Sequence, residues 1–167
     1  MIARRIGSSW MASIVVVASG LALVGVASCA ATSDAGGYVA EASADSQRAS
    51  DALASGEPGR AIEALEALVA RSVPADLEPS DARVILQDAH ERLARLYLAA
   101  GDTDRAAMHV ADGLALGDAD DLFCANLYTT SGRVHEARGE DVEAATAYER
   151  AMAIHETLLD QELGVDP

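Results

Sequence analysis

The sequence has no lysine, one tryptophan, one phenylalanine and two cysteines among its 167 residues. All 12 basic residues are therefore arginines, and they face 27 acidic residues, which gives a formal net charge of −15. A chain this acidic repels nucleic acid and anionic lipid head groups, so we expect neither as a partner.

What the N-terminus does have is an uncharged apolar stretch over residues 10–27, preceded by Arg4 and Arg5. A short basic head followed by an apolar run is the layout of a bacterial export signal. The run ends in Val26, Ala27, Ser28 and Cys29. This ending resembles the lipobox of bacterial lipoproteins. The resemblance implies a signal peptide over residues 1–28, cleavage before Cys29, a diacyl group on its sulfur and usually a further acyl chain on the new amino group.

Two other interpretations of this segment stay open. The apolar stretch is nearly long enough to span a bilayer as an uncleaved helix with its arginine end inside. In the second interpretation, Cys29 is an ordinary buried thiol. We favour the lipobox because a membrane-spanning anchor does not require a cysteine directly after small residues.

Both membrane interpretations place the rest of the chain outside the cytoplasm. Two or three acyl chains are enough for stable anchoring in a membrane. In a Gram-negative cell, Ala30 in place of the aspartate associated with inner-membrane retention favours the periplasmic face of the outer membrane. With Cys29 acylated, Cys124 has no intramolecular disulfide partner, and we expect it to be buried in a helix; the alternative is an intermolecular disulfide.

After cleavage, residues 29–167 would carry 10 arginines and 27 acidic residues, a net charge of −17. Residues 29–37 are rich in alanine, serine, threonine and glycine and predict a flexible tether. Residues 38–167 predict a single helical domain. Within it Gly56, Gly101 and Gly139 are each followed by an acidic residue, as expected where one helix ends and another begins.

An alignment on these glycines reveals three copies of one pattern with internal offsets of 7, 12, 16 and 19 residues. The copies are Ala49, Gly56, Ala61, Leu65, Leu68; Ala94, Gly101, Ala106, Val110, Gly113; and Gly132, Gly139, Ala144, Tyr148, Ala151. The pattern resembles the tetratricopeptide repeat (TPR). That resemblance implies an all-α fold of about three antiparallel helix hairpins in a short right-handed superhelix, with an apolar signal helix before it.

The spacing has a physical reason. Small residues at the first and third positions let the two helices of a hairpin approach closely, whereas Leu93, Tyr97, Val110 and Tyr148 are expected to fill the space between hairpins. The copies lie 45 and 38 residues apart, against about 34 in the family. We place the first insertion at residues 72–81, where Pro74 and Pro79 interrupt helix and Ser80 is suited to cap the next one. A plain helical bundle of the same hairpins is the alternative.

TPR domains generally bind proteins or peptides on the surface formed by the first helix of each pair. Two arginines at matching places, Arg95 and Arg133, suggest capture of a carboxylate. The alternative for Arg95 is an ordinary surface ion pair with Glu91, four residues earlier. The lysine and asparagine set with which some co-chaperones of the family hold a carboxylate is absent. The expected groove residues are Asp88, Glu91, Arg95, Leu98, Asn126, Thr129 and Arg133.

We expect no enzyme activity, cofactor or metal. The four histidines, His90, His109, His135 and His155, fall on separate helices without metal-ligand spacing, and no nucleophile or phosphate-binding motif occurs. The acidic run at residues 117–121 lacks the remainder of a calcium loop and instead predicts a helix cap.

The sequence thus predicts a lipid-anchored protein of the cell envelope that acts as an adaptor or assembly scaffold for a protein partner. The alternative is a non-catalytic accessory subunit of a peptidoglycan or secretion enzyme.

Overall fold

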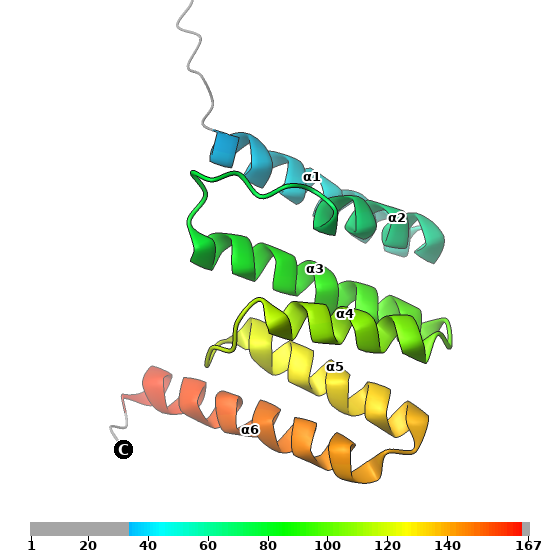
Figure 1. The fold of residues 1–167 in the computed structure, drawn as a ribbon, viewed down its shortest axis with the longest axis vertical. Coiled ribbons are helices and arrows are strands. Elements are labelled where there is room, and N and C mark those ends of the chain that lie inside the picture. The colour runs from blue at the N-terminus through cyan, green and yellow to red at the C-terminus, as the bar shows by residue number, and fades with distance from the viewer. Residues whose placement is uncertain (1–33, 165–167) are drawn as a thin grey trace, which may run out of the picture. The chain divides into compact units, whose positions relative to one another are not determined.

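The computed structural model of the chain describes residues 34–164, and all regular structure in this range is helical. The expected all-α fold is confirmed for these residues (Figure 1). The six helices are α1 (Asp34–Ala54), α2 (Pro58–Val69), α3 (Pro79–Ala99), α4 (Thr103–Ala115), α5 (Leu122–Arg138) and α6 (Asp141–Leu163).

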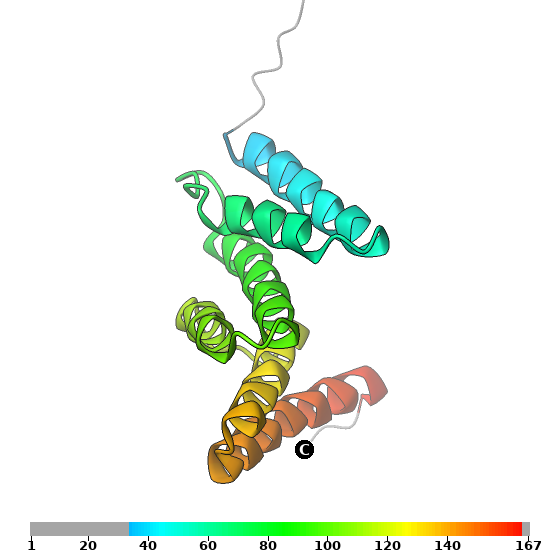
Figure 2. The ribbon, with the colours of Figure 1, turned by 90° about the vertical axis from the view of Figure 1, so that its right-hand side faces the viewer.

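The helices pack mainly against their neighbours in sequence. The closest partners are α1 with α2, α3 with α4, and α5 with α6, and these pairs are joined through α2–α3, α4–α5 and α3–α5 contacts. Figure 2, a view turned by 90°, shows α3 (green) meeting α5 (yellow), with α4 to the left and α6 running to the right. The α3–α5 contact matters below because it brings side chains from two helix pairs together.

Glycine ends the first helix of each pair. Gly56, Gly101 and Gly139 have φ angles of 72°, 80° and 74°, in the left-handed region that glycine enters without a Cβ penalty. The acidic residue that follows each glycine occupies the N-cap position of the next helix. Asp102 caps with its side chain, which accepts a 3.1 Å hydrogen bond from the backbone N–H of Arg105. The predicted helix boundaries at the three glycines are confirmed.

Small residues are buried where the helices of each pair meet. Ala49, Ala61, Ala94 and Ala106 are completely inaccessible, and Gly132 and Ala144 are buried in the last pair. The larger Leu93, Tyr97 and Val110 are also buried. Each such side chain contributes about 1.5–3 kcal/mol through burial.

Tyr148 differs from this expectation, because it packs within its own helix pair. It is half-buried, and its ring lies against Gly132 so closely that a Cβ at Gly132 would be 2.5 Å from Cε1 of Tyr148. Its hydroxyl donates a 2.7 Å hydrogen bond to Glu136 on the same neighbouring helix.

The prediction that Pro79 interrupts helix and Ser80 caps the next one is wrong. Pro79 is the first residue of α3, and Glu78 is at the N-cap without a side-chain hydrogen bond. Proline suits this first position, since the N–H it lacks would have no intrahelical partner. The connection before it, residues 70–78, includes the buried Leu77.

The predicted signal segment, with Val26, Ala27, Ser28 and Cys29, lies outside the described residues. Helix α1 begins at Asp34, so residues 34–37, expected to belong to the tether, are helical. None of the helices described in residues 34–164 combines the length and apolarity needed to cross a membrane.

Candidate functional site

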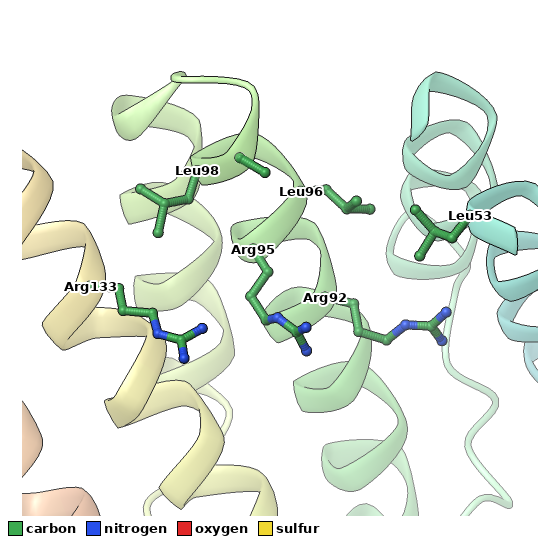
Figure 3. A pocket seen from close by; sticks show the side chains of 7 residues that line it. Leu53, Arg92, Arg95, Leu96, Leu98 and Arg133 are labelled. Carbon is green, nitrogen blue, oxygen red and sulfur yellow. The ribbon is translucent and has the colours of Figure 1, made fainter. Parts of the chain in front are cut away.

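A pocket of about 480 Å³ opens between α1, α3 and α5. Figure 3 shows three arginine side chains next to one another, with leucines along one border. We call this site the arginine pocket. Its lining residues are Leu53, Arg92, Arg95, Leu96, Leu98, Ala99 and Arg133.

Helical spacing explains how α3 supplies most of this pocket. Arg92 and Arg95 are three residues apart. Leu96 follows Arg92 by four residues, and Ala99 follows Arg95 by four, so all of them share one face of α3. Leu53 comes from the last turn of α1 and Arg133 from α5. Three helices that begin far apart in sequence therefore combine cationic and apolar groups in one concavity.

Arg92 is already held by the fold. Its guanidinium donates hydrogen bonds to the hydroxyls of Ser46 and Ser50 on α1, at 2.9 and 3.1 Å, and forms a 3.8 Å ion pair with Asp88. Only 19% of its side chain is exposed. Arg92 thus links α3 to α1 and contributes a fixed positive charge to the edge of the pocket.

Arg95 and Arg133 are more available. The Arg95 side chain is 58% exposed, and its one ion pair, with Glu91, is long at 3.7 Å. Arg133 is exposed and has no ion pair within 4.0 Å among residues 34–164. Both guanidinium groups can therefore turn toward an anionic ligand at little cost.

Glu91 pairs with Arg95 but is not part of the pocket lining. It is only 8% exposed and accepts a 2.9 Å hydrogen bond from the hydroxyl of Thr130 on α5. Burial raises the pKa of Glu91, whereas the Thr130 hydroxyl and the charges of Arg95 and Arg133 act in the opposite direction. One acidic group thus faces the charges of two arginines, which leaves positive charge for a ligand.

The structure brings together three of the seven expected groove residues, Arg95, Leu98 and Arg133, in the pocket lining. Asp88 and Glu91 each pair with a pocket arginine. The other two are not part of the lining: Asn126 is exposed, and Thr129 donates a hydrogen bond to the Ala125 carbonyl.

Sequence reasoning missed Leu53, Arg92, Leu96 and Ala99. A signal for Leu53 was present, because it lies 45 residues before Leu98, the spacing between the first two copies. No comparable signal marks Arg92, whose role depends on serines more than 40 residues away in sequence.

A second cluster joins two histidines that lie on separate helices. His90 on α3 and His109 on α4 lie with their Nδ1 atoms 3.2 Å apart, and Asp112 is near both. They were missed because the two histidines are 19 residues apart and meet only through the packing of α3 on α4.

Other expected polar features have structural roles. Cys124 is buried, as predicted, and contacts Gln87, whose side-chain amide also donates to the carbonyls of Gly113 and Gly117. In the acidic run, Asp121 caps α5 by accepting from the N–H groups of Phe123 and Cys124, which confirms the predicted cap.

Comparisons with protein-family models, with curated proteins and with solved structures find no match to this chain.

Proposed function

We propose that this chain is a lipid-anchored protein of the cell envelope whose helical domain, built from TPR-like hairpins, binds a protein partner through the arginine pocket. The observation that carries the proposal is the concentration of Arg92, Arg95 and Arg133 around one concavity of a chain with a net charge of −15. The site combines charges suited to a carboxylate with leucines suited to an apolar side chain.

The partner that fits this chemistry is a peptide segment with a carboxylate beside an apolar residue. Arginine is suited to this task because its planar guanidinium donates two parallel hydrogen bonds to a carboxylate. Arg95 and Arg133 come from adjacent helix pairs, α3–α4 and α5–α6. A ligand that engages both would therefore also hold the relative position of these pairs.

The TPR-like interpretation is supported by the repeated pattern and its packing. The paired small residues are buried in all three copies, and the turn glycines share one backbone conformation. A helical bundle without TPR geometry is the alternative, and it would present the same pocket.

The lipid anchor is supported by the sequence Val26-Ala27-Ser28-Cys29 after an uncharged apolar run. Anchoring at Cys29 would hold the helical domain next to a membrane. Because an acidic domain is repelled by anionic head groups, its ligand surface would stay available to proteins.

A pull-down of the membrane-anchored protein from its native host tests both parts of the proposal. The wild type should carry acyl mass on Cys29 and should enrich a defined set of envelope proteins, whereas Cys29→Ala should lose the acyl mass and the membrane fraction. Enrichment of one peptidoglycan or secretion enzyme would identify an accessory subunit. Recovery of an N-terminal peptide that begins at Met1 without lipid would contradict anchoring.

The pocket is tested by the double variant Arg95→Ala/Arg133→Ala. A matched control, Arg60→Ala/Arg105→Ala, removes the same charge from arginines outside the arginine pocket, whose side chains are 73% and 61% exposed. Partner capture should fall at least about tenfold in the first variant, as for the loss of a buried charge-assisted contact, and stay near wild type in the control. Equal capture by both would exclude this pocket.

A further inference from the structure

We propose that His90, His109 and Asp112 form a binding site for one divalent transition-metal ion of the zinc type. His90 projects from α3, and His109 and Asp112 from successive turns of α4. Each residue offers one ligand atom, and all three atoms lie within 4.8 Å of one another. The site is separate from the arginine pocket and does not depend on the proposed function.

The separation of the two imidazoles fits shared coordination. Zinc binds histidine nitrogen at about 2.0–2.1 Å, so two nitrogens at tetrahedral positions lie about 3.3 Å apart. The Nδ1 atoms of His90 and His109 are 3.2 Å apart. In the absence of a metal, the same separation suits a hydrogen bond between two neutral rings, which keeps one ring nitrogen pointed at the other.

The surroundings of both imidazoles lower their pKa. Burial lowers the pKa of His90, and the neighbouring His109 lowers it further. Burial likewise lowers the pKa of His109, against the opposing charges of Asp112 and Glu66. A lowered pKa favours the neutral ring, which is the form in which histidine binds a metal.

Packing fixes these rings before any ion arrives. His109 is 6% exposed and stacks on Tyr97 with a centroid distance of 5.4 Å and an interplanar angle of 11°. The Tyr97 hydroxyl donates a 2.5 Å hydrogen bond to Glu66 on α2. On α4, Gly113 allows the close approach to α3, since a Cβ there would lie 3.2 Å from Cβ of His90. Two ligands thus sit on rigid, packed helices.

Asp112 leaves the site accessible from solvent. It is exposed, whereas His90 is half-buried and His109 is buried. Three protein ligands leave a fourth tetrahedral position for water or for a ligand from another molecule. Two imidazoles with one carboxylate favour zinc, copper, nickel or cobalt over calcium and magnesium, which prefer an all-oxygen shell. The net negative charge of the chain favours cation uptake.

Zinc binding to the untagged full chain tests the proposal. After treatment with a chelator, the protein is dialysed against Zn²⁺ near neutral pH, and bound zinc is measured by elemental analysis and titration calorimetry. One ion per chain is expected. Asp112→Asn should weaken binding by about tenfold or more, as is typical when groups around a metal site are replaced. Because Asp112 is exposed, this variant should keep wild-type helicity.

His90→Gln should weaken zinc binding as well, whereas His155→Gln on the exposed face of α6 is the matched control and should bind normally. Cobalt gives a second readout, because a tetrahedral Co²⁺ site absorbs visible light strongly and an octahedral aqueous ion does not. That absorption should appear in wild type, and Asp112→Asn should need about ten times more Co²⁺ to reach it. The absence of stoichiometric zinc would overturn the proposal. Zinc binding at the wild-type level in both Asp112→Asn and His90→Gln would also overturn it and would place the ion elsewhere, for instance on a thiol.

Discussion

Gly132 and Tyr148 fit one another: a Cβ atom added to Gly132 would lie 2.5 Å from Cε1 of the Tyr148 ring. In the other two copies the same two positions hold Ala49 with Leu65 and Ala94 with Val110. The third copy therefore combines a larger residue on its second helix with a smaller one on its first. The small residue on the first helix thus makes room for the large one on the second.

Gly132→Ala should consequently destabilise the domain by about 1–2 kcal/mol, because overpacking outweighs the helix propensity gained from alanine. In a Tyr148→Val background the sign should reverse. There the new pair copies Ala94 and Val110, and alanine should stabilise by roughly 1 kcal/mol relative to glycine. Denaturant unfolding of the four proteins in this cycle measures both effects. The same sign in both backgrounds would show that Tyr148 is not the obstacle.

The buried Asp45 predicts a large loss of stability when it is removed. It is 0% exposed, and Arg71, from the segment after α2, donates a 2.6 Å hydrogen bond to its carboxylate. Arg71 is 29% exposed, so the solvent screens part of the charge that is left behind. We expect Asp45→Ala to cost about 3 kcal/mol, near the lower end for a broken buried pair. The exposed Asp51→Ala on the same helix is the control and should change the free energy of unfolding by less than about 0.5 kcal/mol.

For Glu91 we predict that its contribution to the free energy of unfolding depends on pH. Burial raises its pKa in the folded state, despite the opposing Thr130 hydroxyl and Arg95, so the native protein holds this proton more tightly than the unfolded chain. The resulting stability is complete below the unfolded pKa of Glu91, about 4.3, and is lost as the pH rises through the folded pKa.

Glu91→Gln removes this titration and keeps an acceptor for Thr130. The difference in unfolding free energy between wild type and Glu91→Gln should therefore move in favour of the variant as the pH rises through that interval. Urea unfolding at a series of pH values measures it. A difference that is independent of pH would show that Glu91 has the same proton affinity in both states.

For Asp121 we predict a pH dependence of stability with the opposite sign. Burial alone would raise its pKa, but the backbone N–H of Cys124, the Arg83 side chain and the N–H of Phe123 together lower it. Its ionised form therefore stabilises the fold above the unfolded pKa, and this contribution disappears as the pH falls through the folded pKa.

Asp121→Ala should cost about 0.5–2 kcal/mol near neutral pH, as expected for the loss of a helix N-cap. The loss of stability caused by Asp121→Ala should be smaller at acid pH. Asp120→Ala, which changes an exposed neighbour outside the cap, supplies the control. Thermal unfolding at neutral and acid pH is sufficient, and an equal loss in Asp120→Ala would assign the effect to general charge rather than to the cap.

Features set by short-range spacing could be predicted from the sequence. The glycine that ends a helix, the acidic residue that begins the next one and the small residues between helices all follow from offsets of a few residues, as at Gly139 and Ala144. Arg95 and Arg133 were found because they recur at the same place in two copies. The start of α3 was misjudged because Pro79 suits the first position of a helix as well as the interruption of one.

Features set by the register between helices could not be predicted. His90 and His109 meet only because α3 and α4 pack with one particular offset along their axes, and a shift by one turn would separate them. The link from Arg92 to Ser46 and Ser50 likewise requires the arrangement of α1 on α3. Burial of Asp45 is equally invisible in a sequence where acidic residues are common and most are exposed.

The side-chain amide of Gln87 has a consequence for how the domain opens. A single NH₂ group on α3 donates to carbonyls at the end of α4 and in the loop after it, and contacts the Cys124 sulfur on α5. Separation of any of these segments would leave a fully buried polar group without one of its partners. Residues from α3 to the start of α5 should therefore open as one cooperative unit, and their most protected backbone amides should exchange hydrogen for deuterium at a common rate.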